Sequence, residues 1–133
     1  MPKSNNSQRR SNCPISVSLE LFGDRWTLLI VRDLLFQDLH TFKEFLDQGE
    51  GIASNILADR LKRLEQRGII KKFAHLTDAR KARYELTEKG YDLAPVLIGI
   101  IVWAAKYEQT SAPPALVEQM TKNREKFLAK LKK

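Results

Sequence analysis

The sequence is poor in cysteine and in long hydrophobic runs. Its single cysteine in 133 residues excludes a disulfide within the chain and favours a reducing compartment. The longest stretch without a charged residue is 93–105, thirteen residues, whereas a membrane helix needs about 20. Residues 1–12 are polar and basic, so they predict a disordered basic arm rather than a signal peptide. These absences predict a protein of the cytoplasm without a membrane partner.

Patterns for catalysis and metal binding are also missing. His40 and His75 fall in different predicted elements, and neither has carboxylates or cysteines around it at metal-ligand spacing. The sequence contains no phosphate-binding glycine loop and no nucleophile motif. It therefore predicts no enzyme activity, no cofactor and no metal site. His40 comes just before a predicted helix cap and is expected at the surface.

Positive charge is unevenly distributed along the chain, whose net charge is +7. Residues 54–83 hold nine basic and three acidic side chains, a balance of +6, and both tails are basic, whereas the segments between them are acidic. Clustered positive charge of this kind is typical of proteins that bind polyanions. A solvated surface rich in lysine would give the same pattern, so charge alone leaves both interpretations open.

Apolar periodicity and turn residues predict the order helix, helix, helix, helix, strand, strand, helix, helix. Asp24 and Thr87 are expected to cap the helices that follow them, and Thr41 and Glu44 to form a capping box. Pro95 is expected to kink its helix or to break the first turn. The predicted helices cover residues 14–22, 25–36, 41–47, 54–66, 88–107 and 115–131, and the strands cover 69–74 and 82–86.

This order predicts a fold class, mainly α with a small β-hairpin. Two helices joined by a tight turn that contains glycine, followed by a basic hairpin, are typical of a winged helix-turn-helix. Within residues 54–66, Leu57, Leu61 and Leu64 share one face and are expected to point inward. At about 100° per residue, the polar residues of this helix then point outward or lie on its flank.

The outward face of residues 54–66 predicts a recognition helix for the major groove of DNA. Asparagine can pair with adenine and arginine with guanine, and free amides at a helix start can hold a phosphate. The hairpin 76–83 is expected to reach the minor groove or the backbone beside it. Asp59 would repel a phosphate, so it is expected to pair with Arg63 or to accept from a cytosine amino group. The candidate DNA-binding residues are Ser54, Asn55, Asp59, Arg60, Lys62, Arg63, Arg80, Lys81 and Arg83.

Two other functions are compatible with a basic winged helix. The helix could present an ordinary solvated face, with its cations paired to Asp59 and Glu65. The fold could also serve as a protein-interaction module without specific DNA binding. Such a module is expected to present an apolar or acidic patch where this chain presents a basic one. RNA binding is less consistent with the sequence, because no aromatic stacking platform accompanies the charges.

The apolar segment 93–105 carries large side chains on nearly all sides. A domain of this size has little core with which to surround such a helix, so burial against a second copy is expected. A two-fold homodimer also matches a palindromic DNA site. The alternative is a central core helix wrapped by its own chain. The last helix, within residues 109–133, is expected to join the dimer interface.

The single cysteine is Cys13. A lone cysteine is most often a small hydrophobic residue. Cys13, however, precedes Pro14 at a predicted helix start, where the helix dipole favours the thiolate, and Arg9 and Arg10 are close in sequence. Cys13 is therefore a candidate sensor of oxidants or electrophiles. Without a second cysteine, its oxidation would give an intersubunit disulfide, a mixed disulfide or a sulfenic acid.

Several segments form a set that is specific only when taken together. They are Cys13-Pro14, residues 21–30 (LFGDRWTLLI), 42–45 (FKEF), 51–61 (GIASNILADRL), 84–90 (YELTEKG), 93–97 (LAPVL) and Trp103. This set resembles the HxlR-type bacterial transcription regulators, a MarR-like family, over roughly residues 13–108. The chain departs from the family at Arg25, where lysine is common, and at Ala53, where serine is common. Ser54 is expected to take over the helix cap.

The resemblance implies a winged-helix homodimer that binds operator DNA on the bacterial nucleoid and represses or activates nearby genes, and a repressor is the expected form. Some members of the family use a cysteine at the position of Cys13 to sense electrophiles or oxidants. A small-molecule effector site near Phe22, Trp26 and Trp103 is a further interpretation, although such aromatic residues are more often core. The implied organisation is an arm at 1–12, a DNA-binding domain at 13–108 and a dimerisation helix at 109–133.

Overall fold

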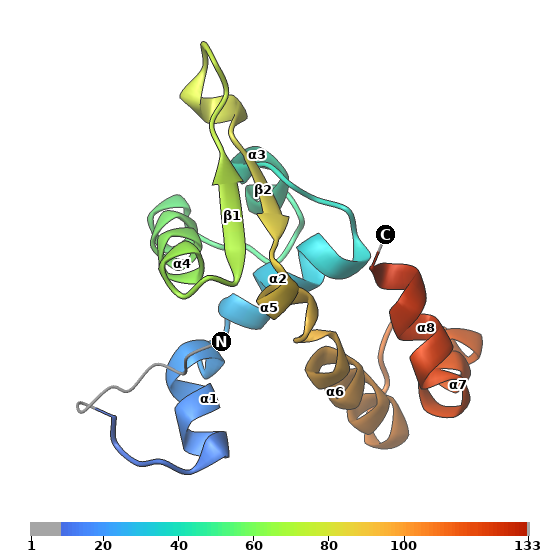
Figure 1. The fold of residues 1–133 in the computed structure, drawn as a ribbon. Coiled ribbons are helices and arrows are strands. Elements are labelled where there is room, and N and C mark those ends of the chain that lie inside the picture. Colours follow the sequence, from blue (N-terminus) through green and yellow to red (C-terminus); the bar gives the residue numbers. More distant parts are fainter. Residues whose placement is uncertain (1–8, 133) are drawn as a thin grey trace.

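The computed structural model describes residues 9–132, so most of the predicted basic arm lies outside the described residues. The predicted order of elements and the mainly α fold class are confirmed. In Figure 1 the β-hairpin rises at one end of the molecule, and α1, α6, α7 and α8 lie at the other. The elements are α1 (Pro14–Phe22), α2 (Thr27–Phe36), α3 (Phe42–Leu46), α4 (Ser54–Gln66), β1 (Ile70–Phe73), η1 (Ala79–Lys81), β2 (Arg83–Leu86), α5 (Glu88–Tyr91), α6 (Ala94–Tyr107), α7 (Pro114–Lys122) and α8 (Arg124–Leu131).

The short helix α3 and the longer helix α4 form the helix-turn-helix. Thr41 begins α3 with the predicted capping box: its hydroxyl accepts from the Glu44 amide, and the Glu44 carboxylate accepts from the Thr41 amide. In the turn, Gly49 and Gly51 have φ values of 106° and 79°, a left-handed conformation that glycine adopts without strain. Local chemistry therefore sets both the start of α3 and the direction in which the chain enters α4.

One hydrophobic core joins α2, α3, α4 and the hairpin. Leu57, Leu61 and Leu64 of α4 are buried in it, as their spacing predicts. Phe45 of α3 packs against Tyr84 of β2, with ring centroids 6.1 Å apart. Because α4 is held by this face, its opposite, polar face points away from the core.

The hairpin after α4 is the wing. Its strands are antiparallel, with Ile70 opposite Leu86 and Phe73 opposite Arg83. An isolated bridge between Thr41 and Arg83 attaches the start of α3 to the edge of the wing. Each strand is slightly shorter than predicted, and the short helix η1 forms the tip between them. The wing is thus fixed to the helix-turn-helix at its base.

Two long helices of the sequence prediction are each divided. The predicted helix 88–107 is two helices, α5 and α6, with Pro95 in the first turn of α6, so the predicted first-turn break is confirmed. The prediction of a single helix at 115–131 is wrong. The chain forms two helices, α7 and α8, which are separated at Asn123, whose φ of −124° and ψ of 45° are not helical. Beyond the break, Arg124 Nη2 donates to the Pro95 carbonyl at 2.8 Å and holds the start of α8 against α6.

The predicted surface position of His40 is wrong. Its side chain is buried; Nδ1 lies 3.0 Å from the carbonyl oxygen of Tyr84, and Nε2 lies 2.6 Å from Asp38 Oδ1. The Tyr84 amide donates in turn to the His40 carbonyl at 2.8 Å. The loop before α3 is therefore paired with β2, and the burial of His40 depends on a strand 44 positions along the chain.

The stretch 88–107 is apolar enough, by length and composition, to raise the question of a membrane span. It has 20 residues and a mean hydropathy of 1.2 in its most apolar window. The continuous helix α6 has 14 residues, which is about 21 Å of helix, whereas the hydrocarbon core of a bilayer is about 30 Å thick. The break before α6 therefore argues against a crossing.

Candidate nucleic-acid interface

The outer face of α4 is polar and exposed. Asn55, Asp59, Lys62 and Arg63 all point outward, as the helical period predicts. Lys62 has no ion pair within the described part of the chain, and Arg63 lies 4.0 Å from Asp59. This face therefore presents an amide, a lysine and an arginine along one side of the helix.

The N-terminus of α4 is not capped by a side chain. Ser54 is the first helical residue and Ala53 is the N-cap, so the expectation that Ser54 takes over the cap is wrong. Both Ser54 and Asn55 are exposed, and the amides of a first helical turn have no partner within the helix. Open amides at a helix start attract anions, because the helix dipole adds to their partial positive charge.

Arg60 is tied to the body of the protein. Its Nε donates to Asp24 Oδ2 at 2.9 Å, and its Nη1 donates to Asp59 Oδ2 at 2.5 Å. Asp24 also accepts from the amides of Trp26 and Thr27 at the start of α2, where the sequence predicts a cap. With its side chain 18% exposed, Arg60 is withdrawn from the outer face and fixes α4 to α2.

These contacts determine the charge of Asp24. Burial raises the pKa of this carboxyl, but hydrogen bonds from Thr27, Arg60 and the Trp26 amide outweigh burial and lower the pKa from 3.8 to about 2. Because the folded pKa is the lower one, the stabilisation is complete above about pH 5 and is lost as the pH falls toward 2. At about 1.4 kcal/mol per pKa unit, it amounts to at most about 2 kcal/mol.

Asp24→Asn is therefore expected to lower the free energy of unfolding by about 1 to 2 kcal/mol at pH 7, and by about 1 kcal/mol less at pH 3. Urea unfolding followed by circular dichroism at both pH values measures the difference. Asp59→Asn is the matched control, because its side chain is 54% exposed and its pairs should contribute under about 1 kcal/mol. An effect of Asp24→Asn that is equal at both pH values would contradict this assignment.

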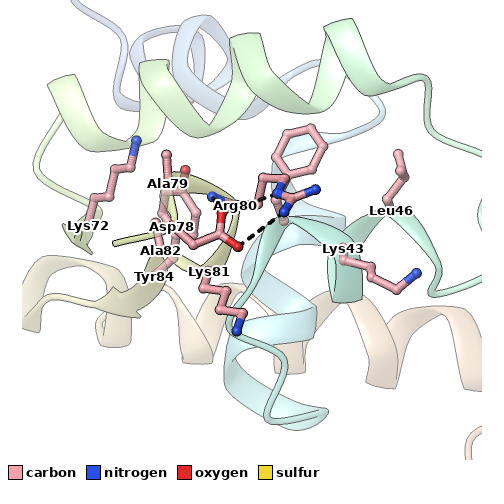
Figure 2. A pocket seen from close by; sticks show the side chains of 10 residues that line it. Lys43, Leu46, Lys72, Asp78, Ala79, Arg80, Lys81, Ala82 and Tyr84 are labelled. Carbon is pink, nitrogen blue, oxygen red and sulfur yellow. Dashed lines mark hydrogen bonds and ion pairs between the residues drawn. The ribbon is translucent and has the colours of Figure 1, made fainter. Parts of the chain in front are cut away.

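The wing carries three candidate cations, Arg80, Lys81 and Arg83, and all are exposed. Arg80 Nε lies 3.2 Å from Asp78 Oδ1, an ion pair drawn in Figure 2. Arg83 Nε donates to Glu85 Oε1 at 2.6 Å. Lys81 has no ion pair among residues 9–132, so it is the wing candidate whose charge is least neutralised.

Two lysines that the sequence analysis did not include belong to this region, one in the wing and one beside it. Lys72 of β1 is opposite Tyr84 in the strand register, with Nζ 5.9 Å from the centre of the tyrosine ring. A cavity lies between α3 and the wing tip, and both Lys72 and Lys43 of α3 border it (Figure 2). The charge balance of residues 54–83 was a signal for Lys72. No sequence pattern indicated Lys43, because it belongs to α3 and only the fold brings it close to the wing.

A second exposed surface, on α6, is apolar. Four large apolar side chains of α6 are between 37% and 64% exposed. They recur every three or four residues, so they form one stripe along the helix. On α1, Ile15 and Leu19 are 71% and 56% exposed. The alternative of a core helix wrapped by its own chain is therefore wrong for α6. The apolar stripe consists of Val96, Ile100, Trp103 and Tyr107.

Cys13 is exposed at the N-terminal end of α1, where Pro14 is the first helical residue. Hydrogen bonds from the amides of Ser16 and Ile15 lower the pKa of its thiol. The exposure and the lowered pKa both increase the population of an accessible thiolate, which is the reactive form of cysteine.

Comparisons with known proteins agree with this architecture. The HxlR-like helix-turn-helix family profile matches residues 21–112. An uncharacterised HTH-type transcriptional regulator of Mycobacterium tuberculosis is 31% identical over 122 residues, which cover 91% of this chain and 76% of the relative. YodB, an HTH-type transcriptional regulator of Bacillus subtilis, is 34% identical over 96 residues, which cover 71% of this chain and 85% of YodB.

Solved structures show the same fold. The reduced form of YodB matches with a TM-score of 0.59 at 35% identity, covering 73% of this chain and 95% of YodB. The redox regulator HypR in its oxidised form matches with a TM-score of 0.64 at 25% identity, covering 74% of this chain and all of HypR. These relatives are transcriptional regulators and not enzymes. With its helix-turn-helix and wing, this chain belongs to the HxlR-like helix-turn-helix family of transcriptional regulators, which are MarR-like winged-helix proteins.

Proposed function

We propose that this protein is a homodimer that binds an operator in double-stranded DNA sequence-specifically and represses nearby genes. The observation that carries the proposal is the outer face of α4, where exposed polar side chains adjoin an uncapped helix N-terminus. The wing, which carries the candidate cations, stands beside α4 (Figure 1). A solvated basic helix would need neither feature, and a protein-docking surface is expected to be apolar or acidic at this place.

In this proposal α4 lies in the major groove with its N-terminus toward the base edges. Asn55 reads a base, and the open amides meet a phosphate. The wing contacts the neighbouring minor groove or backbone through its cations. Arg60 acts through Asp24, by setting the angle of α4, rather than through DNA. The proposed DNA contacts are Ser54, Asn55, Asp59, Lys62, Arg63, Arg80, Lys81 and Arg83.

The apolar stripe supports the homodimer, because water would otherwise cover four large side chains on one helix face. Two-fold pairing along α6 places two copies of α4 on one duplex, which suits a palindromic operator. The domain boundaries that we propose are 13–108 for the DNA-binding unit and 109–133 for the helices that support the interface. The site of action is the nucleoid in the cytoplasm.

Selection of binding sites by the purified protein, at two salt concentrations, tests the proposal. Wild type is expected to enrich a palindromic motif. Asn55→Ala should weaken binding about tenfold and relax the preference at one position of each half-site. Lys62→Ala should weaken binding to all sequences and reduce the salt slope by about 1 per subunit. Lys122→Ala, which removes an equal charge on α7, is the control for net charge.

Weak binding without a motif, kept by both α4 variants, would contradict the proposal. The basic face would then be electrostatic only, and the protein-interaction module would become the better interpretation. A motif lost equally in Lys122→Ala would show that net charge, rather than the face of α4, controls binding.

We also propose that Cys13 makes repression responsive to electrophiles or oxidants. Its exposure and its lowered pKa support this, together with the states in which relatives have been solved. YodB is known in reduced, quinone-bound and diamide-treated forms, and HypR in reduced and oxidised forms. A quinone would form one carbon–sulfur bond with the thiolate, and its ring oxygen would take a proton from water.

Cys13→Ser is expected to bind DNA like wild type but to lose the response to 1,4-benzoquinone. Wild type should lose affinity about tenfold on treatment, because the adduct is attached next to the exposed apolar residues of α1. Fluorescence anisotropy with labelled operator measures the affinity, and mass spectrometry locates the adduct. A Cys13→Ser variant that responds as strongly as wild type would remove Cys13 from the mechanism.

A further inference from the structure

The ring of His40 is buried where the loop before α3 meets strand β2. Its Nδ1 lies 3.0 Å from the carbonyl oxygen of Tyr84, and its Nε2 lies 2.6 Å from Asp38 Oδ1. A carbonyl oxygen only accepts hydrogen bonds, and so does an ionised carboxylate. Each ring nitrogen must therefore donate, and an imidazole with two N–H groups is the charged imidazolium.

The charges around the ring suit a cation. Glu85 Oε1 lies 3.6 Å from Nδ1 of His40, and the Glu44 carboxylate accepts from the His40 amide at 2.9 Å. With Asp38, carboxylates of the loop, of α3 and of β2 all face this residue, and a positive charge is attracted to each of them. Two basic side chains of the wing lie beside Glu85 and offset part of this negative charge. They are Arg83, at 2.6 Å from Glu85, and Lys71, opposite Glu85 in the strand register.

The turn that carries Asp38 has a conformation that few residues adopt. The φ of Asp38 is 54°, in the left-handed region, and among residues 9–132 no other residue except glycine has a positive φ. The amides of Gln37 and Leu39 both donate to the Asp33 carbonyl, at 3.2 and 3.1 Å, so the turn is closed on both sides of Asp38. The contact with the ring of His40 adds a side-chain bond that holds Asp38 in this turn.

Loss of one proton from the ring would keep one contact and break the other. The Tyr84 carbonyl requires a hydrogen on Nδ1, so the neutral ring keeps its proton there and leaves a lone pair on Nε2. That lone pair would point at the Asp38 carboxylate from 2.6 Å, and two acceptors at this distance repel each other. Asp38 would then turn away, and the turn would lose a contact that offsets the cost of its backbone conformation.

This loop also joins the wing to the helix-turn-helix. The Tyr84 amide donates to the His40 carbonyl at 2.8 Å, and the bridge between Thr41 and Arg83 comes at the next residue. The backbone of His40 therefore pairs with β2, while its ring holds the turn before α3. A change in that turn moves the residue to which the wing is attached.

We propose that His40 is a proton-dependent link between the turn before α3 and the wing. The protonated ring connects Asp38 to Tyr84, and the neutral ring releases Asp38. Because the link needs the protonated ring, its stabilisation is present at acidic pH and is lost as the pH rises through the range in which histidines titrate, about pH 5 to 8. Its effect on DNA rests on the function proposed above: release of the turn loosens the wing, so operator binding weakens as the pH rises.

The second histidine provides a reference within the chain. The amides of Thr77 and Asp78 donate to His75 Nδ1 at 3.3 and 3.1 Å, so this nitrogen carries no proton. Neutral His75 is therefore expected to have its proton on Nε2, and neutral His40 on Nδ1. Ring nitrogen chemical shifts between pH 5 and pH 9 distinguish the two forms, and His75→Gln assigns the signals. A neutral His40 with its proton on Nε2, or a His40 ring that never carries two protons in this range, overturns the proposal.

Asp38→Asn is the matched variant, because asparagine keeps the shape of the side chain and tolerates a positive φ. Its amide can accept from a protonated Nε2 or donate to a bare one, so the link should lose its pH dependence. Wild type should resist urea better than Asp38→Asn at pH 6 and no better at pH 8. His75→Gln should follow wild type at both pH values. An advantage of wild type over Asp38→Asn that is equal at pH 6 and pH 8 overturns the proposal.

Operator binding separates this proposal from the proposed function. In fluorescence anisotropy at constant ionic strength, wild-type affinity should fall about fivefold from pH 6 to pH 8, and that of Asp38→Asn less than about twofold. Specific operator binding with equal pH dependence in the two proteins overturns the effect on DNA and leaves the proposed function standing. The expected ring spectra and urea midpoints in a protein that binds no specific DNA support the link and overturn the proposed function together with the effect on DNA.

Discussion

Replacing Ile100 and Trp103 together by aspartate is expected to convert the proposed dimer to a monomer and to weaken operator binding by at least about a hundredfold. These side chains are 50% and 64% exposed in the single chain, so the substitution removes little from its own core. In a two-fold dimer each substitution occurs twice, and burying a large apolar side chain is worth about 1.5 to 3 kcal/mol. Losing four such contacts and placing four carboxylates in the interface exceeds the stability of most dimers of this size.

Sedimentation equilibrium measures the oligomeric state, and fluorescence anisotropy measures operator affinity. Gln37→Asp is the control, because it adds a charge at an exposed position after α2 that borders the same pocket as Ile100 but is not part of the apolar stripe. The double variant should keep the circular dichroism spectrum of wild type, since the stripe lies outside the core. A variant that remains dimeric, or that unfolds as a monomer, would contradict an interface along α6.

Local sequence patterns predicted the parts of the fold that depend on neighbouring residues. The leucine stripe of α4, the capping box at Thr41 and the break at Pro95 each follow from residues within about two helical turns. The outward face of α4 followed from that same stripe, because fixing the buried side of a helix fixes its opposite side. The position of α4 and its polar face were therefore predictable.

Features that depend on distant partners were not predictable. Arg60 belongs to the flank of α4 by helical period, yet it is held by Asp24, which is 36 positions away. His40 has no local reason to be buried, and its partner is a carbonyl of β2. The cavity beside the wing likewise exists only because α3 and η1 meet in space. Periodicity assigns a side chain to a face, but it does not say what the fold places against that face.

Two glycine-to-alanine substitutions are expected to change stability in opposite directions. Alanine is favoured over glycine by about 0.5 to 1 kcal/mol inside a helix. At Gly99 in α6, an added Cβ would come no closer than 3.9 Å to Arg124 Nη2, so Gly99→Ala should be stabilising by up to that amount. At Gly90 in α5, the same Cβ would collide with the carbonyl oxygen of Ile69 and lie 2.8 Å from Leu86 Cδ2.

The carbonyl of Ile69 has little freedom to move away, because it accepts from both the amide and the hydroxyl of Thr87 at 3.0 Å. Gly90→Ala is therefore expected to lower the free energy of unfolding by about 2 to 3 kcal/mol. Urea unfolding of wild type and both variants at one protein concentration measures the pair, because the apparent stability of a dimer depends on concentration. Equal effects of the two substitutions would mean that α5 does not pack on the start of β1 in solution. A loss at Gly90 alone would support that packing, through which the wing is joined to α6.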